Sequence, residues 1–211
     1  MPAASMSLNA PILLTLARIA SIVVLVAVFY APLRWAHGFA ALVFVLAAIT
    51  DWLDGYLARR WNQTSSFGAF LDPVADKLIV AVALVLIVQA HPSPWIAVPA
   101  AVIIGREITV SALREWMAEL GSRARVAVSP IGKIKTVLQM IAITALLYQA
   151  PLFGLPTMQI GIVTLYVAVA LTLWSMVSYL RAAWPTVQAE SRRERLDSDP
   201  AFKKNSASAR E

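Results

Sequence analysis

Cysteine is absent from this chain of 211 residues, and histidine occurs only twice. Without cysteine there are neither disulfides nor thiolate metal ligands. His37 and His91 fall in predicted loops, and neither is grouped with another type of metal ligand. Any metal site must therefore consist of carboxylates, which suit Mg²⁺ or Mn²⁺ better than zinc.

Charge is also scarce, since 14% of the residues are charged and 59% are hydrophobic. A soluble domain of this size is about one quarter charged. A water-soluble helical protein with a rich core would not need several apolar stretches of about 20 residues, the length that crosses a bilayer. The composition therefore predicts a membrane protein. Its net charge of +6 is expected from basic cytoplasmic loops, and no nucleic-acid-binding motif accompanies it.

The apolar stretches predict an all-α fold with six transmembrane helices, over residues 10–31, 37–58, 70–90, 94–113, 133–150 and 157–180. Pro-rich turns separate several of these spans. Lysine and arginine are nearly absent from the turns at one end and cluster at the other, so both termini are expected in the cytoplasm. No cleavage site follows the first span, which we expect to stay in the membrane.

The chain is expected to divide into two parts. Residues 1–181 should form one membrane domain, and residues 182–211 a polar cytoplasmic tail in which a short interfacial helix gives way to disorder. The tail is basic, so contact with anionic lipid and the absence of any role both remain open.

Four of the six aspartates lie within 26 residues, beside the second and third spans. Asp51 and Asp54 are three residues apart and Asp72 and Asp76 are four apart, so each pair faces one side of a helix. Helix caps and ion pairs with nearby cations would explain one or two of these acids. Two antiparallel helices joined by the loop 59–69 would bring the pairs face to face, as an oxygen cage for one or two hard cations.

The aspartates belong to a longer string: Asp51-x2-Asp54-Gly55-x2-Ala58-Arg59-x8-Gly68-x3-Asp72-x3-Asp76. At every defining position it resembles the signature of the CDP-alcohol phosphotransferase (phosphatidyltransferase) family. The resemblance implies that Asp51, Asp54 and Asp72 bind metal, and that Asp76 is both a ligand and the general base. Two Mg²⁺ or Mn²⁺ ions would then hold the pyrophosphate of a CDP-linked lipid.

The same resemblance implies a CDP-lipid site beside the metals. Gly55, Arg59 and Ser65 would line it, and the small residues Ala58 and Gly68 would leave room for the ligand. An N-terminal motif of the family matches residues 9–18, except that Ile12 replaces the usual asparagine. Thr15 and Arg18 remain as candidate contacts of the lipid nucleotide.

The second half of the chain holds a basic block that includes four candidate ligands of an acceptor phosphate: Arg106, Arg114, Lys133 and Lys135. Positive-inside bias and Arg–Glu pairs are the alternative explanation. However, Arg106 lies well inside the fourth span and Lys135 enters the fifth, and cations there need anionic partners. A phosphate on the acceptor would be such a partner, whereas serine or choline would not require so many cations.

This block, from Arg106-Glu107-Ile108 to Lys133-x-Lys135-Thr136, resembles the bacterial branch of the family that forms phosphatidylglycerophosphate. The similarity runs from about Asn9 to Tyr179. It implies transfer of the phosphatidyl group of CDP-diacylglycerol to sn-glycerol 3-phosphate, with CMP as the second product. It also implies a bacterial cytoplasmic (inner) membrane location, an active site facing the cytoplasm and, by analogy, a homodimer.

No serine or cysteine nucleophile is evident, so we expect direct in-line displacement. Other acceptors within the family remain open, namely inositol phosphate, serine and phosphatidylglycerol. An intramembrane prenyltransferase, a transporter or a non-catalytic subunit fits less well. Prenyltransferases carry two acidic clusters far apart in the chain, transporters usually show repeats, and an assembly subunit has no need of four acids.

Overall fold

The protein is described by a computed structural model that covers residues 10–61, 66–120 and 130–198. Side chains are described at residues 16–50, 71, 73–120, 134–189 and 192. Within these ranges the regular structure consists of helices, apart from an isolated bridge between Leu152 and Leu155. The predicted all-α fold is confirmed for this part of the chain.

Six helices follow one another along the described chain: α1 (Ala10–Phe29), α2 (Ala36–Trp61), α3 (Ser66–Ala90), α4 (Pro94–Glu119), α5 (Pro130–Tyr148) and α6 (Thr157–Ser198). Each contains most or all of one predicted span. Three have stretches long and apolar enough to cross a membrane, in α3, α4 and α6, by length and composition. The described apolar stretches of α1, α2 and α5 are shorter, so six crossings and the orientation of the termini stay predictions.

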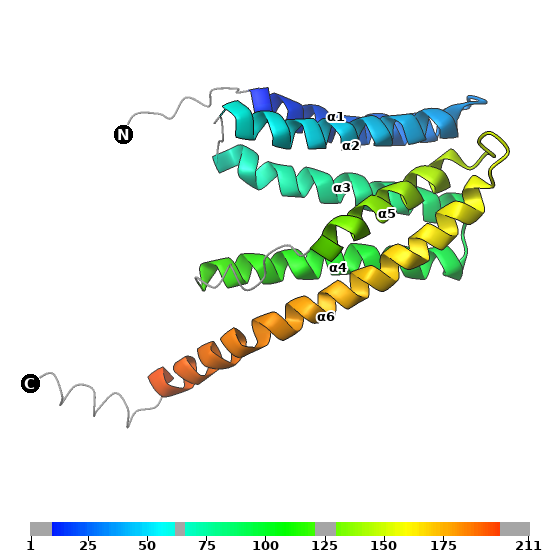
Figure 1. The fold of residues 1–211 in the computed structure, drawn as a ribbon. Helices are drawn as coiled ribbons and strands as arrows, with labels where there is room; N and C mark the ends of the chain where they lie inside the picture. The colour runs from blue at the N-terminus through cyan, green and yellow to red at the C-terminus, as the bar shows by residue number, and fades with distance from the viewer. Residues whose placement is uncertain (1–9, 62–65, 121–129, 199–211) are drawn as a thin grey trace, which may run out of the picture.

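The bundle forms from successive helices that reverse direction (Figure 1). α1 packs against α2 and α3, α5 packs against α6 and α2, and α4 joins α3 to α6. The beginnings of α1, α3 and α5 and the ends of α2, α4 and α6 lie toward the same end of the molecule. The four aspartates come from these helix ends, as do Arg114, Lys133 and Lys135 of the basic cluster, while Arg106 lies near the middle of α4.

Apolar side chains from all six helices form the main core, among them Leu25, Phe44, Leu84, Ile103, Ile143 and Leu165. A smaller cluster of Val110, Met117, Tyr179 and Ala183 joins α4 to α6 nearer the ends of these helices. Arg106 of α4 lies in the sequence between Ile103 of the main core and Val110 of the smaller cluster.

Two boundaries differ from the sequence-based expectation. The loop expected over residues 59–69 is shorter, because α2 continues to Trp61 and α3 already begins at Ser66, with Pro73 inside it. The short helix expected after residue 181 directly continues α6, which extends to Ser198 and not only to residue 180. Ala183 is buried against α4, and residues 187–195 are mostly good helix formers, so the helix does not end where the apolar pattern ends.

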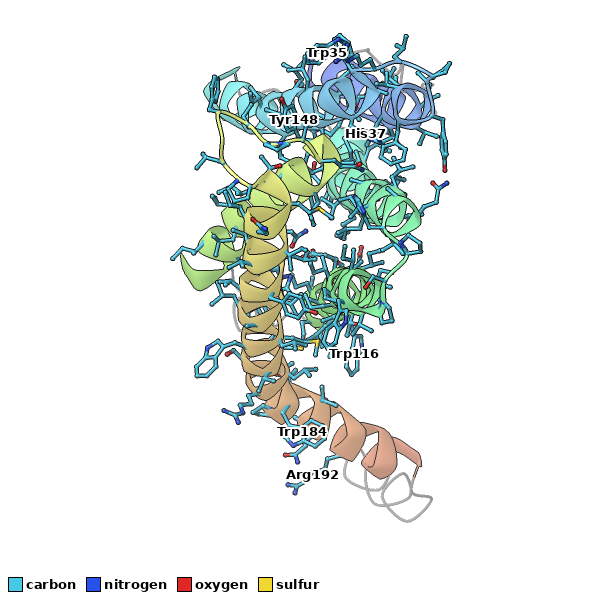
Figure 2. The ribbon with its side chains drawn as sticks, turned by 90° about the vertical axis from the view of Figure 1, so that its right-hand side faces the viewer. Trp35, His37, Trp116, Tyr148, Trp184 and Arg192 are labelled. Carbon is cyan, nitrogen blue, oxygen red and sulfur yellow. The ribbon has the colours of Figure 1, made fainter. Side chains whose placement is uncertain are left out.

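The extended α6 is visible in Figure 2, where Trp184 and Arg192 mark a helical segment that continues beyond the body of the bundle. At the other end, Trp35 just before α2 and Trp95 at the start of α4 are both largely exposed. Exposed tryptophan at the ends of apolar helices is typical of the boundary between bilayer and water.

Candidate active site

The four aspartates lie on two neighbouring helices. Asp51 and Asp54 belong to the last three turns of α2, while Asp72 and Asp76 belong to the first three turns of α3. These two segments lie at the same end of the bundle (Figure 1), and α2 and α3 contact each other and both contact α1. The side chains of Asp51, Asp54 and Asp72 lie outside the described residues, so the proposed oxygen cage stays a prediction.

Asp76 has a described side chain, and it is paired with Arg18 of α1. The Nη1 atom of Arg18 donates a hydrogen bond to Oδ1 of Asp76 at 2.7 Å. The arginine side chain is 1% exposed, whereas the aspartate side chain is 43% exposed. A buried guanidinium among apolar helices requires an anionic partner. The pair therefore links the Asp76 carboxylate, which is partly exposed, to α1.

The family resemblance implied that Arg18 contacts the lipid nucleotide, and the residue pattern did not predict this ion pair. The sequence feature that could have indicated the ion pair is that Arg18 is the one charged residue of α1, because such a charge needs a partner from another helix. The identity of that partner depends on how α1 and α3 pack, which the residue pattern does not specify.

A second polar cluster lies between α4, α5 and α6, with Glu107 at its centre. Oε1 of Glu107 accepts a hydrogen bond from Arg106 Nη1 at 3.0 Å and another from Lys135 Nζ at 2.5 Å. Arg106 and Lys135 are 7% and 3% exposed. The Nη2 atom of Arg106 also donates to Ser175 Oγ of α6 at 2.7 Å. Three helices are thus joined by one buried network of charged and polar groups.

Arg114 extends this cluster along α4, two turns beyond Arg106. Its Nη2 atom donates to the hydroxyl of Tyr179 at 2.6 Å, and its guanidinium carbon lies 4.9 Å from the centroid of the tyrosine ring. The guanidinium carbon of Arg106 is 5.9 Å from the same centroid. Tyr179 therefore contacts both arginines, by a hydrogen bond and by cation–π attraction.

The cluster of Arg106, Glu107, Arg114 and Lys135 contains three cations and one carboxylate. Glu107 is the only acidic partner of these cations among the described side chains. The Nε atoms of Arg106 and Arg114 are buried and have no hydrogen-bond partner in the described part of the protein. Buried N–H groups are normally satisfied, so the two free donors and the excess positive charge suit an anion.

The structure brings together three of the four predicted acceptor residues, Arg106, Arg114 and Lys135. The Arg–Glu pairing that was the alternative explanation is also present, between Arg106 and Glu107. Glu107 forms a second ion pair with Lys135. Ser175 and Tyr179 were missed. Their signal was weak, because they are two polar residues four apart in a helix that contains several other polar residues.

The remaining predicted site residues have side chains outside the described part of the structure. The side chains of Thr15, Gly55, Ala58, Arg59, Gly68 and Lys133, and the whole of Ser65, lie outside the described residues. No group of three or more potential metal ligands occurs among the side chains that are described. Three of the four aspartates lie outside these side chains, so the metal site stays a prediction.

Comparison with known proteins identifies the same family by a family model and by individual relatives. A family model described as CDP-alcohol phosphatidyltransferase matches residues 8–174. Proteins from Salmonella choleraesuis (strain SC-B67) and Pectobacterium atrosepticum are 56% and 57% identical to this chain over 178 residues. A protein from Shigella flexneri serotype 5b is 55% identical over the same length. Each alignment covers 84% of this chain and 96% of the relative, and all three relatives are named CDP-diacylglycerol–glycerol-3-phosphate 3-phosphatidyltransferase.

Proposed function

The chain belongs to the CDP-alcohol phosphatidyltransferase family, and we propose that it transfers the phosphatidyl group of CDP-diacylglycerol to sn-glycerol 3-phosphate. The products would be phosphatidylglycerophosphate and CMP. The three relatives carry both substrates in their shared name and align with most of this chain.

The observation that supports this acceptor is the charge of the cluster around Glu107. Three cations and one carboxylate leave two positive charges in a region largely shielded from water. A phosphate monoester carries nearly two negative charges at neutral pH. Serine and inositol offer no such charge, so the cluster favours an acceptor that bears a phosphate.

In the proposed reaction, Arg106, Arg114, Lys133 and Lys135 bind the acceptor phosphate and orient its primary hydroxyl. The hydroxyl oxygen forms a bond to the lipid-side phosphorus of CDP-diacylglycerol, while the bond from that phosphorus to the CMP oxygen breaks. The hydroxyl proton passes to the Asp76 carboxylate, which Arg18 holds at 2.7 Å. Thr15, Gly55, Ala58, Arg59, Ser65 and Gly68 remain the proposed CDP-lipid contacts.

An acceptor panel tests the proposal. Purified protein in detergent would be given labelled CDP-diacylglycerol and, separately, sn-glycerol 3-phosphate, inositol phosphate, serine or phosphatidylglycerol. We expect labelled lipid product and equimolar CMP with glycerol phosphate alone. The Asp76→Asn protein is the negative control. Turnover with serine or inositol phosphate at comparable kcat/KM would contradict the proposed acceptor.

We also propose that Asp51, Asp54, Asp72 and Asp76 hold Mg²⁺ or Mn²⁺, with two ions in the site. Carboxylate oxygens are the ligands that these ions prefer, and the sequence offers no thiolate and no His cluster. Bound metal would neutralise charge on the donor pyrophosphate. EDTA should abolish turnover, and Mg²⁺ or Mn²⁺ should restore it, whereas chelator-resistant activity would rule out the metal site.

The proposed orientation in a bacterial inner membrane, with the active site facing the cytoplasm, can be tested because the chain has no cysteine. Phe153→Cys would place one thiol in the 151–156 turn, where Phe153 is 95% exposed. Ser206→Cys would place one in the polar C-terminal region. A membrane-impermeant maleimide should label the first variant in intact cells from the outside and the second only after lysis. The opposite pattern would reverse the orientation.

A further inference from the structure

Two residues of α6 each hold an arginine of α4. Ser175 and Tyr179 are four residues apart, so they lie on one face of the helix, on consecutive turns. Ser175 Oγ accepts from Arg106 Nη2 at 2.7 Å, and the Tyr179 hydroxyl accepts from Arg114 Nη2 at 2.6 Å. Both α6 side chains are buried, being 3% and 6% exposed.

These contacts restrict arginine side chains that would otherwise be mobile. An arginine carries five N–H donors in a planar fork, and two anchoring contacts are enough to fix the plane of that fork. For Arg114 the anchors are the hydroxyl and the ring face of Tyr179. For Arg106 they are Ser175 and Glu107.

Arg106 and Arg114 each keep an N–H donor that these contacts do not use. Nε of Arg106 and Nε of Arg114 lack partners in the described part of the protein. Arginine binds phosphate best when two of its donors are aimed together at the anion. Each α6 hydroxyl therefore engages one Nη2 atom and fixes its guanidinium, while the Nε–H donor keeps a set direction.

We propose that Ser175 and Tyr179 are positioning residues for the acceptor, which hold Arg106 and Arg114 in the orientation that binds the acceptor phosphate. This inference rests on the proposed function and deepens it, because α6 then sets the affinity for the phosphate without touching it. Both residues lie just beyond the segment 8–174 that the family model matches.

A purely structural role is the alternative, in which the hydroxyls only satisfy two buried cations. The two roles differ in what they change. A structural hydroxyl affects thermal stability and affects the KM values of both substrates alike. A positioning hydroxyl affects the KM for glycerol phosphate and leaves the KM for CDP-diacylglycerol unchanged.

The experiment uses Tyr179→Phe, which removes the hydroxyl and keeps the ring, and Ser175→Ala in the full-length protein. Each should raise the KM for sn-glycerol 3-phosphate about five- to tenfold, since each removes one hydrogen bond to a charged group. The donor KM and kcat should stay within about twofold of wild type. Ser175→Thr keeps a hydroxyl and should restore most of the acceptor affinity.

The same helix provides matched controls. The Tyr166 hydroxyl donates to the Trp95 carbonyl at 3.0 Å near the other end of α6, and Ser178 Oγ donates to the Trp174 carbonyl at 3.1 Å on an exposed face. Tyr166→Phe and Ser178→Ala lose similar hydrogen bonds without touching either arginine. Both should keep the wild-type KM for glycerol phosphate.

A double-mutant cycle tests whether Tyr179 acts through Arg114. Once Arg114→Ala has raised the acceptor KM, adding Tyr179→Phe should change it less than twofold further. Inorganic phosphate, used as a competitive inhibitor, should lose affinity for Tyr179→Phe and Ser175→Ala by the same factors as the acceptor does.

The outcomes separate this inference from the proposed function. If the wild-type protein does not use glycerol phosphate, both are overturned. If it does, but Tyr179→Phe and Ser175→Ala both keep the wild-type acceptor KM or raise both substrate KM values equally, only the positioning role is overturned. Should one variant fail to fold, as judged by thermal melting in detergent, the other still decides the question.

Discussion

Arg18 of α1 and Asp76 of α3 are 58 residues apart in the sequence and form an ion pair at 2.7 Å. The arginine is almost completely buried and the aspartate is partly exposed. The pair links a motif of the first helix to the candidate catalytic carboxylate, and it suggests that Arg18 orients Asp76 in addition to the role that the family resemblance implies.

Arg18→Ala distinguishes these roles. Loss of the guanidinium should let the Asp76 carboxylate rotate away from the reacting hydroxyl, so kcat should fall about tenfold or more, a part of the usual effect of general-base catalysis. The donor KM should change less than kcat. Steady-state kinetics with both substrates is the measurement, and Arg18→Lys, which keeps the charge, should be less impaired. A large rise in donor KM at unchanged kcat would instead support a contact with the lipid nucleotide.

Asp76→Asn tests the base itself. The amide has the shape of the carboxylate but cannot take up the proton, so kcat should fall by about 10²- to 10⁴-fold. Binding of CDP-diacylglycerol, measured by equilibrium dialysis with labelled lipid in micelles, should be largely retained. Asp197→Asn, outside the acidic cluster, should behave like wild type. Near-normal turnover of Asp76→Asn would exclude this carboxylate as the base.

Glu107→Gln removes the carboxylate shared by Arg106 and Lys135. Because both cations are buried, loss of their only described acidic partner should destabilise the protein by about 3 kcal/mol or more. Thermal melting in detergent would measure this loss. The exposed Glu115, two turns further along α4, provides the control Glu115→Gln, which should be nearly neutral.

The same variant has a second expected property. An added anion can take the place of the missing carboxylate, so inorganic phosphate should raise the Tm of Glu107→Gln more than that of the wild type. Equal shifts for the two proteins would show that phosphate does not take the place of the Glu107 carboxylate.

Gly161 allows α6 to pack closely on α5. A Cβ atom at this position would lie 2.8 Å from Leu146 Cγ and 3.3 Å from Ala145 Cβ. Since Leu146 is fully buried, it has little room to move, and Gly161→Ala should cost about 1–3 kcal/mol. Gly105→Ala is the matched control, because nothing lies within 4 Å of its Cβ. That variant should be as stable as wild type or more stable, by up to about 1 kcal/mol, and a drop in Tm for both would refute the packing explanation.

Most features confirmed from the sequence are local. The six helices follow the apolar stretches because a run of apolar residues bounded by prolines can satisfy its backbone hydrogen bonds only as a helix in an apolar surrounding. The spacing of the aspartates and the family signature likewise needed no knowledge of packing, and the comparisons confirm the family. The separate interfacial helix expected after residue 181 instead continues α6, because the polar residues that follow form helix well.

The sequence by itself therefore determined the helical elements, the family and the clustering of acids on two consecutive helices, because each follows from residues close together in the chain. Only the tertiary structure decided which charges meet. The partners Arg18 and Asp76, Arg106 and Ser175, and Arg114 and Tyr179 are 58, 69 and 65 residues apart. Their pairing depends on the rotation and register of one helix against another. Side-chain packing across the whole bundle determines both, and the spacing of residues within one helix does not.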